Sequence, residues 1–226
     1  MNEDTPSVIN QNAKFYFSIL FSIFFLYLLQ QSPIVQGLYN IVYLPFNCLH
    51  ELGHLLASSI ILPTVDSQFK ICHLYEGGCS NMITIEELPV CWGSIIMKLA
   101  GSLMVFTITI AGIIVLRNKK SPASVAGKKF LIFGLLINLI NLFPILPAML
   151  GSVNDGYGIC IILIRMGHST YPSVEFSFLF LYIASLVTLV SFYYLGSCLF
   201  YLLSIPGFKI QKQFENPTEY ILSLKL

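Results

Sequence analysis

Two histidines and a glutamate lie within the five residues His50-Glu51-Leu52-Gly53-His54. The histidines are four positions apart, a spacing that places both imidazoles on one face of an α-helix. Both rings can therefore bind one metal ion, and Glu51 can act as general base toward a water molecule at that metal. The pattern predicts a metallohydrolase site.

The surroundings of this motif make it informative. It lies inside an apolar run, 38–62, that is long enough to cross a bilayer. Each ionisable group at bilayer depth costs about 2–3 kcal/mol on insertion scales, so the three together cost about 6–9 kcal/mol. A bound cation compensates for this cost. The alternative interpretation is that His50 and Glu51 only form hydrogen bonds within the core.

The composition is that of a membrane protein. Of 226 residues, 56% are hydrophobic and only 10% are charged, whereas soluble domains carry about 25% charged residues. A formal net charge of +1 gives no electrostatic reason to expect a nucleic acid partner. The polar start lacks the basic residues of a signal peptide. We therefore expect the first apolar stretch to stay in the membrane, with the plasma membrane of a prokaryote as the default location.

We predict an all-α polytopic membrane protein that forms a single domain over 1–226. Five transmembrane segments are expected at about 15–29, 38–62, 93–116, 130–166 and 176–203. The fourth is predicted to be broken around Pro144–Gly156, where prolines and a polar stretch interrupt the apolar run. The alternative is that 130–150 spans alone and an outer loop follows.

The connections between these segments indicate the orientation. Five of the 12 Lys and Arg residues fall within 117–129, so the positive-inside rule places this connection in the cytoplasm. The connection 63–92 then lies outside as a short hairpin-like loop, because polar and apolar residues alternate near its centre. Lys98 is expected to extend toward the outer interface without a functional role. A disulfide within the outer loop would join two of Cys72, Cys79 and Cys91.

A catalytic zinc site needs a third protein ligand beside the two histidines, and an open position. Asp155 is the strongest candidate, because it and Glu51 are the only acidic residues expected within the membrane. Its neighbours Asn154 and Gly156 favour turn geometry that lets the carboxylate point into a cavity. The alternatives are an ordinary surface turn at these residues and His168 as the third ligand.

Further short motifs accompany the histidine motif in a fixed order. They are His50-Glu51-Leu52-Gly53-His54, Gly77-Gly78, Ala100-Gly101-Ser102-Leu103-Met104, Asn141-Leu142-Phe143-Pro144 and Asp155-Gly156. This order resembles the site-2 protease family of intramembrane zinc metallopeptidases, as a minimal core without accessory domains. The resemblance covers roughly 38–166.

The resemblance implies one zinc ion per chain, held by His50, His54 and Asp155. It implies that Glu51 activates water and that Asn141 lies beside the site, where it orients the substrate backbone or the developing oxyanion. The expected reaction is hydrolysis of peptide bonds in or near transmembrane segments of other membrane proteins, within the lipid bilayer.

Two other functions fit the same residues. A divalent-metal transporter also places His and Asp in its spans, although the first, third and fifth expected spans show no path of ligand residues. A catalytically silent relative of the proteases would bind membrane helices without cutting them.

Overall fold

Long apolar helices form the body of this chain. The structure is a computed structural model, and it describes residues 8–62, 69–70, 80–81, 88–145, 154–168 and 173–203. These residues form α1 (Val8–Gln31), α2 (Pro33–Ile61), β1 (Phe69–Lys70), β2 (Ser80–Asn81), α3 (Trp92–Leu116), α4 (Pro122–Ile140), α6 (Asp155–Arg165) and α7 (Val174–Leu203). The all-α class expected from the sequence is confirmed for the described residues, apart from the two short strands.

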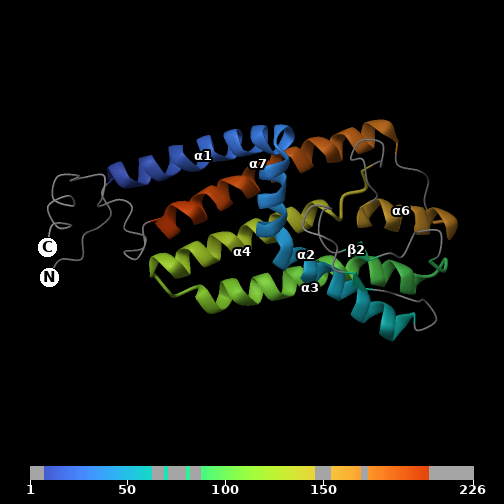
Figure 1. The fold of residues 1–226 in the computed structure, drawn as a ribbon. Coiled ribbons are helices and arrows are strands. Elements are labelled where there is room, and N and C mark those ends of the chain that lie inside the picture. The colour runs from blue at the N-terminus through green and yellow to red at the C-terminus, as the bar shows by residue number, and fades with distance from the viewer. Residues whose placement is uncertain are drawn as a thin grey trace, which may run out of the picture.

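Four of the helices lie side by side in the order α1, α7, α4 and α3, and α2 crosses them (Figure 1). Ser32 separates α1 from α2 and caps α2, since its side chain accepts a hydrogen bond from the Val35 N–H and Pro33 follows it. Proline suits this first helical position because its missing N–H would have had no helical partner. The chain bends by 117° between α1 and α2.

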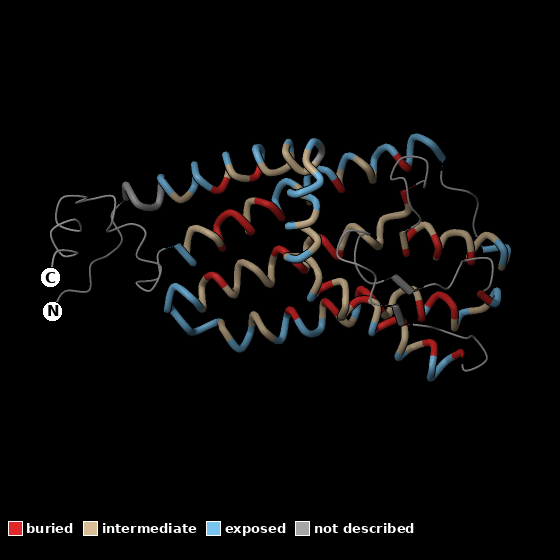
Figure 2. The backbone as a smooth tube through the Cα atoms, in the orientation of Figure 1, coloured by how far each residue is buried: buried red, intermediate tan, exposed pale blue. Residues whose placement is uncertain are grey.

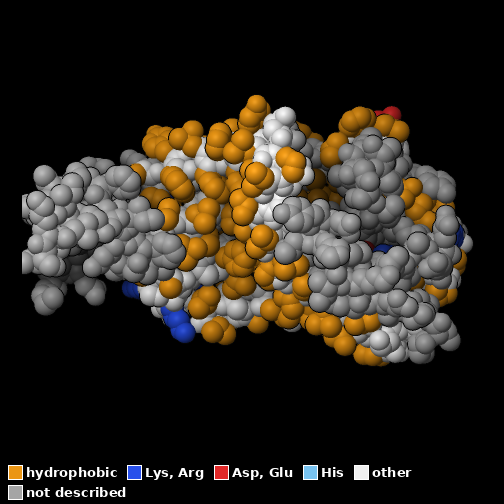
Figure 3. Space-filling model, viewed as in Figure 1, with side chains coloured by type: hydrophobic (Ala, Val, Ile, Leu, Met, Phe, Trp, Pro, Cys, Tyr) orange, Lys and Arg blue, Asp and Glu red, His pale blue; other side chains and the backbone are white. Residues whose placement is uncertain are grey.

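Three helices, α3, α4 and α7, are long and apolar enough to cross a membrane. The bent pair of α1 and α2 adds a fourth candidate if the two helices count as one span. Hydrophobic side chains cover much of the visible surface of these helices, and Lys and Arg gather at the end where α3 leads into α4 (Figure 3). The described residues therefore contain three to four candidate spans, which is consistent with a helical membrane protein. The five segments expected from the sequence stay a prediction.

The expected break in the fourth segment is visible in the described residues. α4 ends at Ile140, where Leu142 and Phe143 each bond to the carbonyl three residues earlier, and the next described helix begins at Asp155. Both α4 and α6 pack against α3. The single span over 130–150 is thus not formed as one helix, and the passage of α4 and α6 through one bilayer stays a prediction.

The connection between α2 and α3 contains a short antiparallel strand pair. Phe69 lies opposite Asn81, and Lys70 lies opposite Ser80. This pairing agrees with the hairpin-like loop expected from the sequence. Cys91 is not in a disulfide, and the other two cysteines considered for one, Cys72 and Cys79, lie outside the described residues.

A buried core joins the crossing helix α2 to the helices it passes (Figure 2). Gly134 on α4 permits this contact, because a Cβ atom there would overlap the ring of Phe46 on α2. A second cluster packs the end of α2 against α3 and α6. The first core comprises Phe46, Val105, Phe133, Ile137, Phe192 and Leu195. The second comprises Leu62, Leu88, Ile95, Met97 and Ile162.

Candidate metal centre

Three buried side chains from two helices converge on one point. His50 and His54 lie on α2, and Asp155 is the first residue of α6. Oδ2 of Asp155 lies 2.8 Å from Nε2 of His50 and 3.2 Å from Nε2 of His54. The two Nε2 atoms are 3.0 Å apart. The fold therefore brings together the three residues that the sequence predicts as ligands, although Asp155 lies more than 100 residues after the histidines.

The directions of these contacts favour a shared cation over hydrogen bonding alone. Although Oδ2 of Asp155 lies close to both imidazoles, it accepts no well-directed hydrogen bond from any described residue. Bonds of about 2.0–2.2 Å to a first-row metal ion set donor separations of about 3.0–3.6 Å, depending on geometry. The observed separations are 2.8, 3.0 and 3.2 Å, close to the lower limit of this range. The three side chains therefore fit such an ion after outward shifts of a few tenths of an ångström.

A backbone carbonyl fixes the ring of His54. Nδ1 of His54 lies 2.7 Å from the carbonyl oxygen of Met97 on α3. A carbonyl can only accept, so Nδ1 donates its hydrogen there, and the lone pair of a neutral ring then lies on Nε2, toward Asp155. Outer contacts of this kind orient histidine ligands in metal sites.

Two glycines let α3 approach the histidine face of α2. A Cβ atom at Gly53 would overlap the carbonyl of Ala100. A Cβ atom at Gly101 would lie 2.6 Å from both Cε1 and Nε2 of His54 and 2.9 Å from Cε1 of His50. The motif Ala100-Gly101-Ser102, weak as a sequence signal, thus forms the wall against which both imidazoles rest.

The carboxylate of Asp155 is positioned by the start of α6. Asn154 caps this helix: its side-chain oxygen accepts from the Tyr157 N–H at 3.0 Å, and its amide donates to the Phe143 carbonyl at 2.7 Å. The N–H of Gly156 donates to the carbonyl of Asn141 at 2.8 Å. These bonds join the start of α6 to the end of α4, so the interruption between the two helices is what presents Asp155 to the histidines.

Glu51 follows His50 on α2 and is half-buried. Its Oε2 atom is buried and has no hydrogen-bond partner among the residues that the structure describes. Its carboxylate interacts electrostatically with both histidines and with Asp155. A buried carboxylate oxygen without a donor is placed to accept a proton from a molecule that enters the site. The catalytic role of Glu51 itself stays a prediction.

Lys98 corrects one expectation from the sequence. Its ammonium does not extend to the membrane surface but lies 3.3 Å from Oδ1 of Asp155, with 15% of the side chain exposed. The other histidine considered as a ligand, His168, is exposed and lies against the ring of Trp92, with centroids 5.7 Å apart. It is not part of the metal-binding group.

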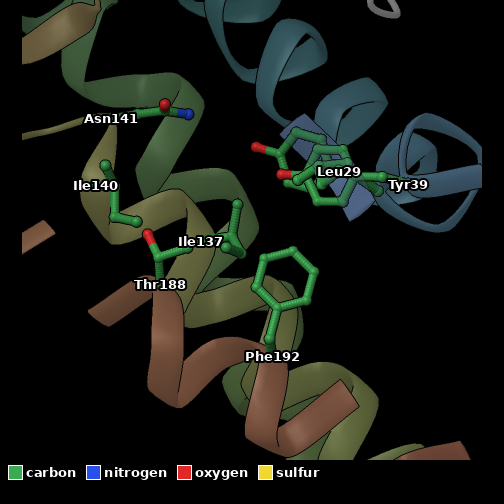
Figure 4. A pocket seen from close by; sticks show the side chains of 8 residues that line it. Leu29, Tyr39, Ile137, Ile140, Asn141, Thr188 and Phe192 are labelled. Atoms are coloured by element: carbon green, nitrogen blue, oxygen red, sulfur yellow. The ribbon is translucent and has the colours of Figure 1, made fainter. Parts of the chain in front are cut away.

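Asn141 stands beside the metal group and does not belong to it. Its carbonyl binds the residue after Asp155, and its side chain points toward a cavity of about 260 Å³ among α1, α2, α4 and α7 (Figure 4). The amide also interacts with the hydroxyl of Tyr43. A substrate-positioning role for Asn141 stays a prediction. The cavity is lined by Leu29, Tyr39, Tyr43, Ile137, Ile140, Asn141, Thr188 and Phe192.

Comparison of the chain with protein-family models, with curated proteins and with solved structures finds no match.

Proposed function

We propose that the chain is an intramembrane metallopeptidase that hydrolyses peptide bonds in or near transmembrane segments of other membrane proteins. The observation that carries this proposal is the buried group of His50, His54 and Asp155, with Glu51 next to the first ligand. The order of motifs that resembles the site-2 protease family supports the same activity, and zinc is the metal we propose.

The two histidines and the aspartate would hold the ion through Nε2, Nε2 and Oδ2, the atoms that face one another. Zinc, when bound, supplies Lewis-acid chemistry that polarises a peptide carbonyl and acidifies water. Two imidazoles in the set favour zinc and similar ions over calcium, which prefers oxygen ligands only.

Glu51 would supply the proton transfers. Its unpartnered Oε2 accepts a proton from the attacking water, and the protonated carboxyl then donates to the leaving amine. Lys98 contacts Asp155, and the Met97 carbonyl of α3 contacts His54, so both would hold the ligands in place. Asn141 would orient the substrate backbone from the end of α4, next to the cavity that its amide faces.

Glu51→Gln tests this assignment. The chain is reconstituted in liposomes with synthetic single-span peptides, cleavage is followed by mass spectrometry, and metal is counted by plasma emission spectrometry. We expect the variant to keep its metal and to lose about 10²–10⁴-fold in cleavage rate, the usual contribution of a general base. Glu175→Gln, at the exposed start of α7, is the matched control and should cleave like the parent chain.

Equal cleavage by the parent chain and Glu51→Gln would contradict the role of Glu51. Metal uptake into the liposomes without any peptide cleavage would contradict the peptidase itself and identify a transporter. Peptide binding without turnover, at saturating zinc, would identify a silent relative.

A further inference from the structure

The two oxygens of Asp155 have different partners. Oδ2 faces the two imidazole nitrogens, at 2.8 and 3.2 Å, whereas Oδ1 lies 3.3 Å from the ammonium of Lys98. Lys98 reaches this position from α3, directly after Met97, whose carbonyl holds His54. One turn of α3 therefore contacts both a histidine and the carboxylate, each on the side away from the shared point.

We propose that Lys98 is a positioning residue that restricts Asp155 to binding the metal through one oxygen. This inference rests on the metal site proposed above. A carboxylate without a partner on its second oxygen can turn and bind a metal through both. The ammonium beside Oδ1 opposes that turn, because it holds this oxygen and repels a cation that approaches it. One coordination position is thereby kept open for water and the substrate carbonyl.

The charges in the site predict whether removal of Lys98 strengthens or weakens metal binding. Asp155 and Glu51 are two carboxylates, and Lys98 is the only cation that the structure places in ion-pair contact with either, among the described residues. A divalent ion compensates the carboxylates that Lys98 would otherwise balance, and it is repelled by Lys98 at short range. Removal of the ammonium should therefore strengthen metal binding. If Lys98 only supported the fold, its removal would instead weaken metal binding, as the loss of an outer contact generally does.

The test uses Co²⁺ in the full chain, because its visible spectrum reports coordination number. For Lys98→Met we expect the loss of most of the visible absorption per bound cobalt, as the carboxylate binds through both oxygens. We also expect Lys98→Met to bind cobalt about tenfold more tightly than the parent chain, or tighter still, in competition with a chelator. Lys98→Arg should match the parent chain in both readouts, because it keeps a positive charge beside Oδ1 of Asp155. Lys128→Met, which removes an ammonium that donates to the Lys119 carbonyl, should also match it.

A second neutral variant separates charge from hydrogen bonding. The amide of Lys98→Gln can still donate to Oδ1, so we expect it to keep the parent spectrum while retaining cobalt more tightly. An unchanged spectrum in Lys98→Met, or looser retention in both neutral variants, would overturn the inference and leave the metal site intact. Absence of cobalt from the parent chain would overturn the metal site together with the inference.

Discussion

Nδ1 of His54 lies 2.7 Å from the backbone carbonyl oxygen of Met97, across the contact between α2 and α3. This carbonyl belongs to the fold and not to a side chain, so the orientation of the ring is fixed by how closely the two helices pack. Close packing is in turn permitted by the glycine on each helix that meets its neighbour, Gly53 and Gly101. The geometry of the metal centre therefore depends on close packing against α3, a helix that supplies none of the three ligands.

Substitution of Gly101 by alanine should remove the metal without unfolding the chain. The new Cβ atom would lie 2.6 Å from Cε1 and Nε2 of His54 and 2.9 Å from Cε1 of His50, so both rings must move. We expect metal content to fall to a small fraction of one per chain, measured by plasma emission spectrometry, with helicity unchanged in circular dichroism.

Gly37→Ala is the matched control for this substitution, because nothing lies within 4 Å of a Cβ atom at Gly37. It should keep its metal and gain up to about 1 kcal/mol in stability, since glycine is unfavourable within a helix. Full metal content in Gly101→Ala would show that the rings do not rest on α3.

Loss of the cap at Asn154 should weaken metal binding and also destabilise α6. Asn154→Ala removes the hydrogen bonds to the Tyr157 N–H and the Phe143 carbonyl, at a cost of about 1 kcal/mol for the cap. Because Asp155 is the next residue, we expect metal retention against a chelator to weaken by about 10–100-fold, as for other outer contacts of metal ligands.

Ser121→Ala separates these two effects. Ser121 caps α4 by accepting from the Ser124 N–H at 3.3 Å, so its loss should lower thermal stability by a similar amount and leave metal retention unchanged. If both variants weakened metal retention equally, general loosening of the fold would account for the result, and the cap would have no specific role at Asp155.

The metal group was predictable because it depends on local geometry and on the rarity of charge in membranes. A spacing of four residues places His50 and His54 on one helical face. Apart from Glu51, Asp155 is the only acidic residue expected within the membrane, so few residues could be the third ligand. The role of Lys98 was not predictable in the same way. The buried face of α3 carries small and hydroxyl residues such as Ser94, Gly101 and Ser102. Lys98 lies only six residues into this helix, where a long lysine side chain can also reach the interface, so it was assigned to the membrane surface.

The helix boundaries were also only partly predictable from the sequence. Ser32-Pro33 and Ser121-Pro122 are both capping serines followed by a proline, and they begin α2 and α4 several residues before the apolar runs from which the spans were predicted. Hydropathy locates the part of a helix that lies in lipid, whereas capping residues locate its start. The bend after α1 falls at Ser32-Pro33, so the capping signal gives its position. Neither signal gives its angle of 117°.

Asn141 should affect the substrate and not the metal. Its side chain faces the cavity beside α4, so Asn141→Leu removes an amide that can bind a substrate carbonyl or the developing oxyanion. We expect cleavage of the single-span peptides to slow by about 10²-fold, the usual effect of losing one such donor, with metal content unchanged.

Thr188→Val is the control for Asn141→Leu, since Thr188 lines the same cavity from α7. It should cleave at nearly the parent rate. Asn141→Leu keeps the backbone carbonyl that binds the Gly156 N–H. A loss of metal in this variant would therefore mean that the side chain of Asn141 supports the metal site, which would contradict a role toward the substrate alone.

The most direct test of the account is the number of metal ions per chain, measured in detergent for the parent chain, Asp155→Ala and His168→Ala. We predict about one zinc in the parent chain and in His168→Ala, because His168 lies against Trp92 and outside the ligand group. Asp155→Ala should lose most of the metal. Full zinc in Asp155→Ala, or no metal in the parent chain, would contradict a centre built from His50, His54 and Asp155.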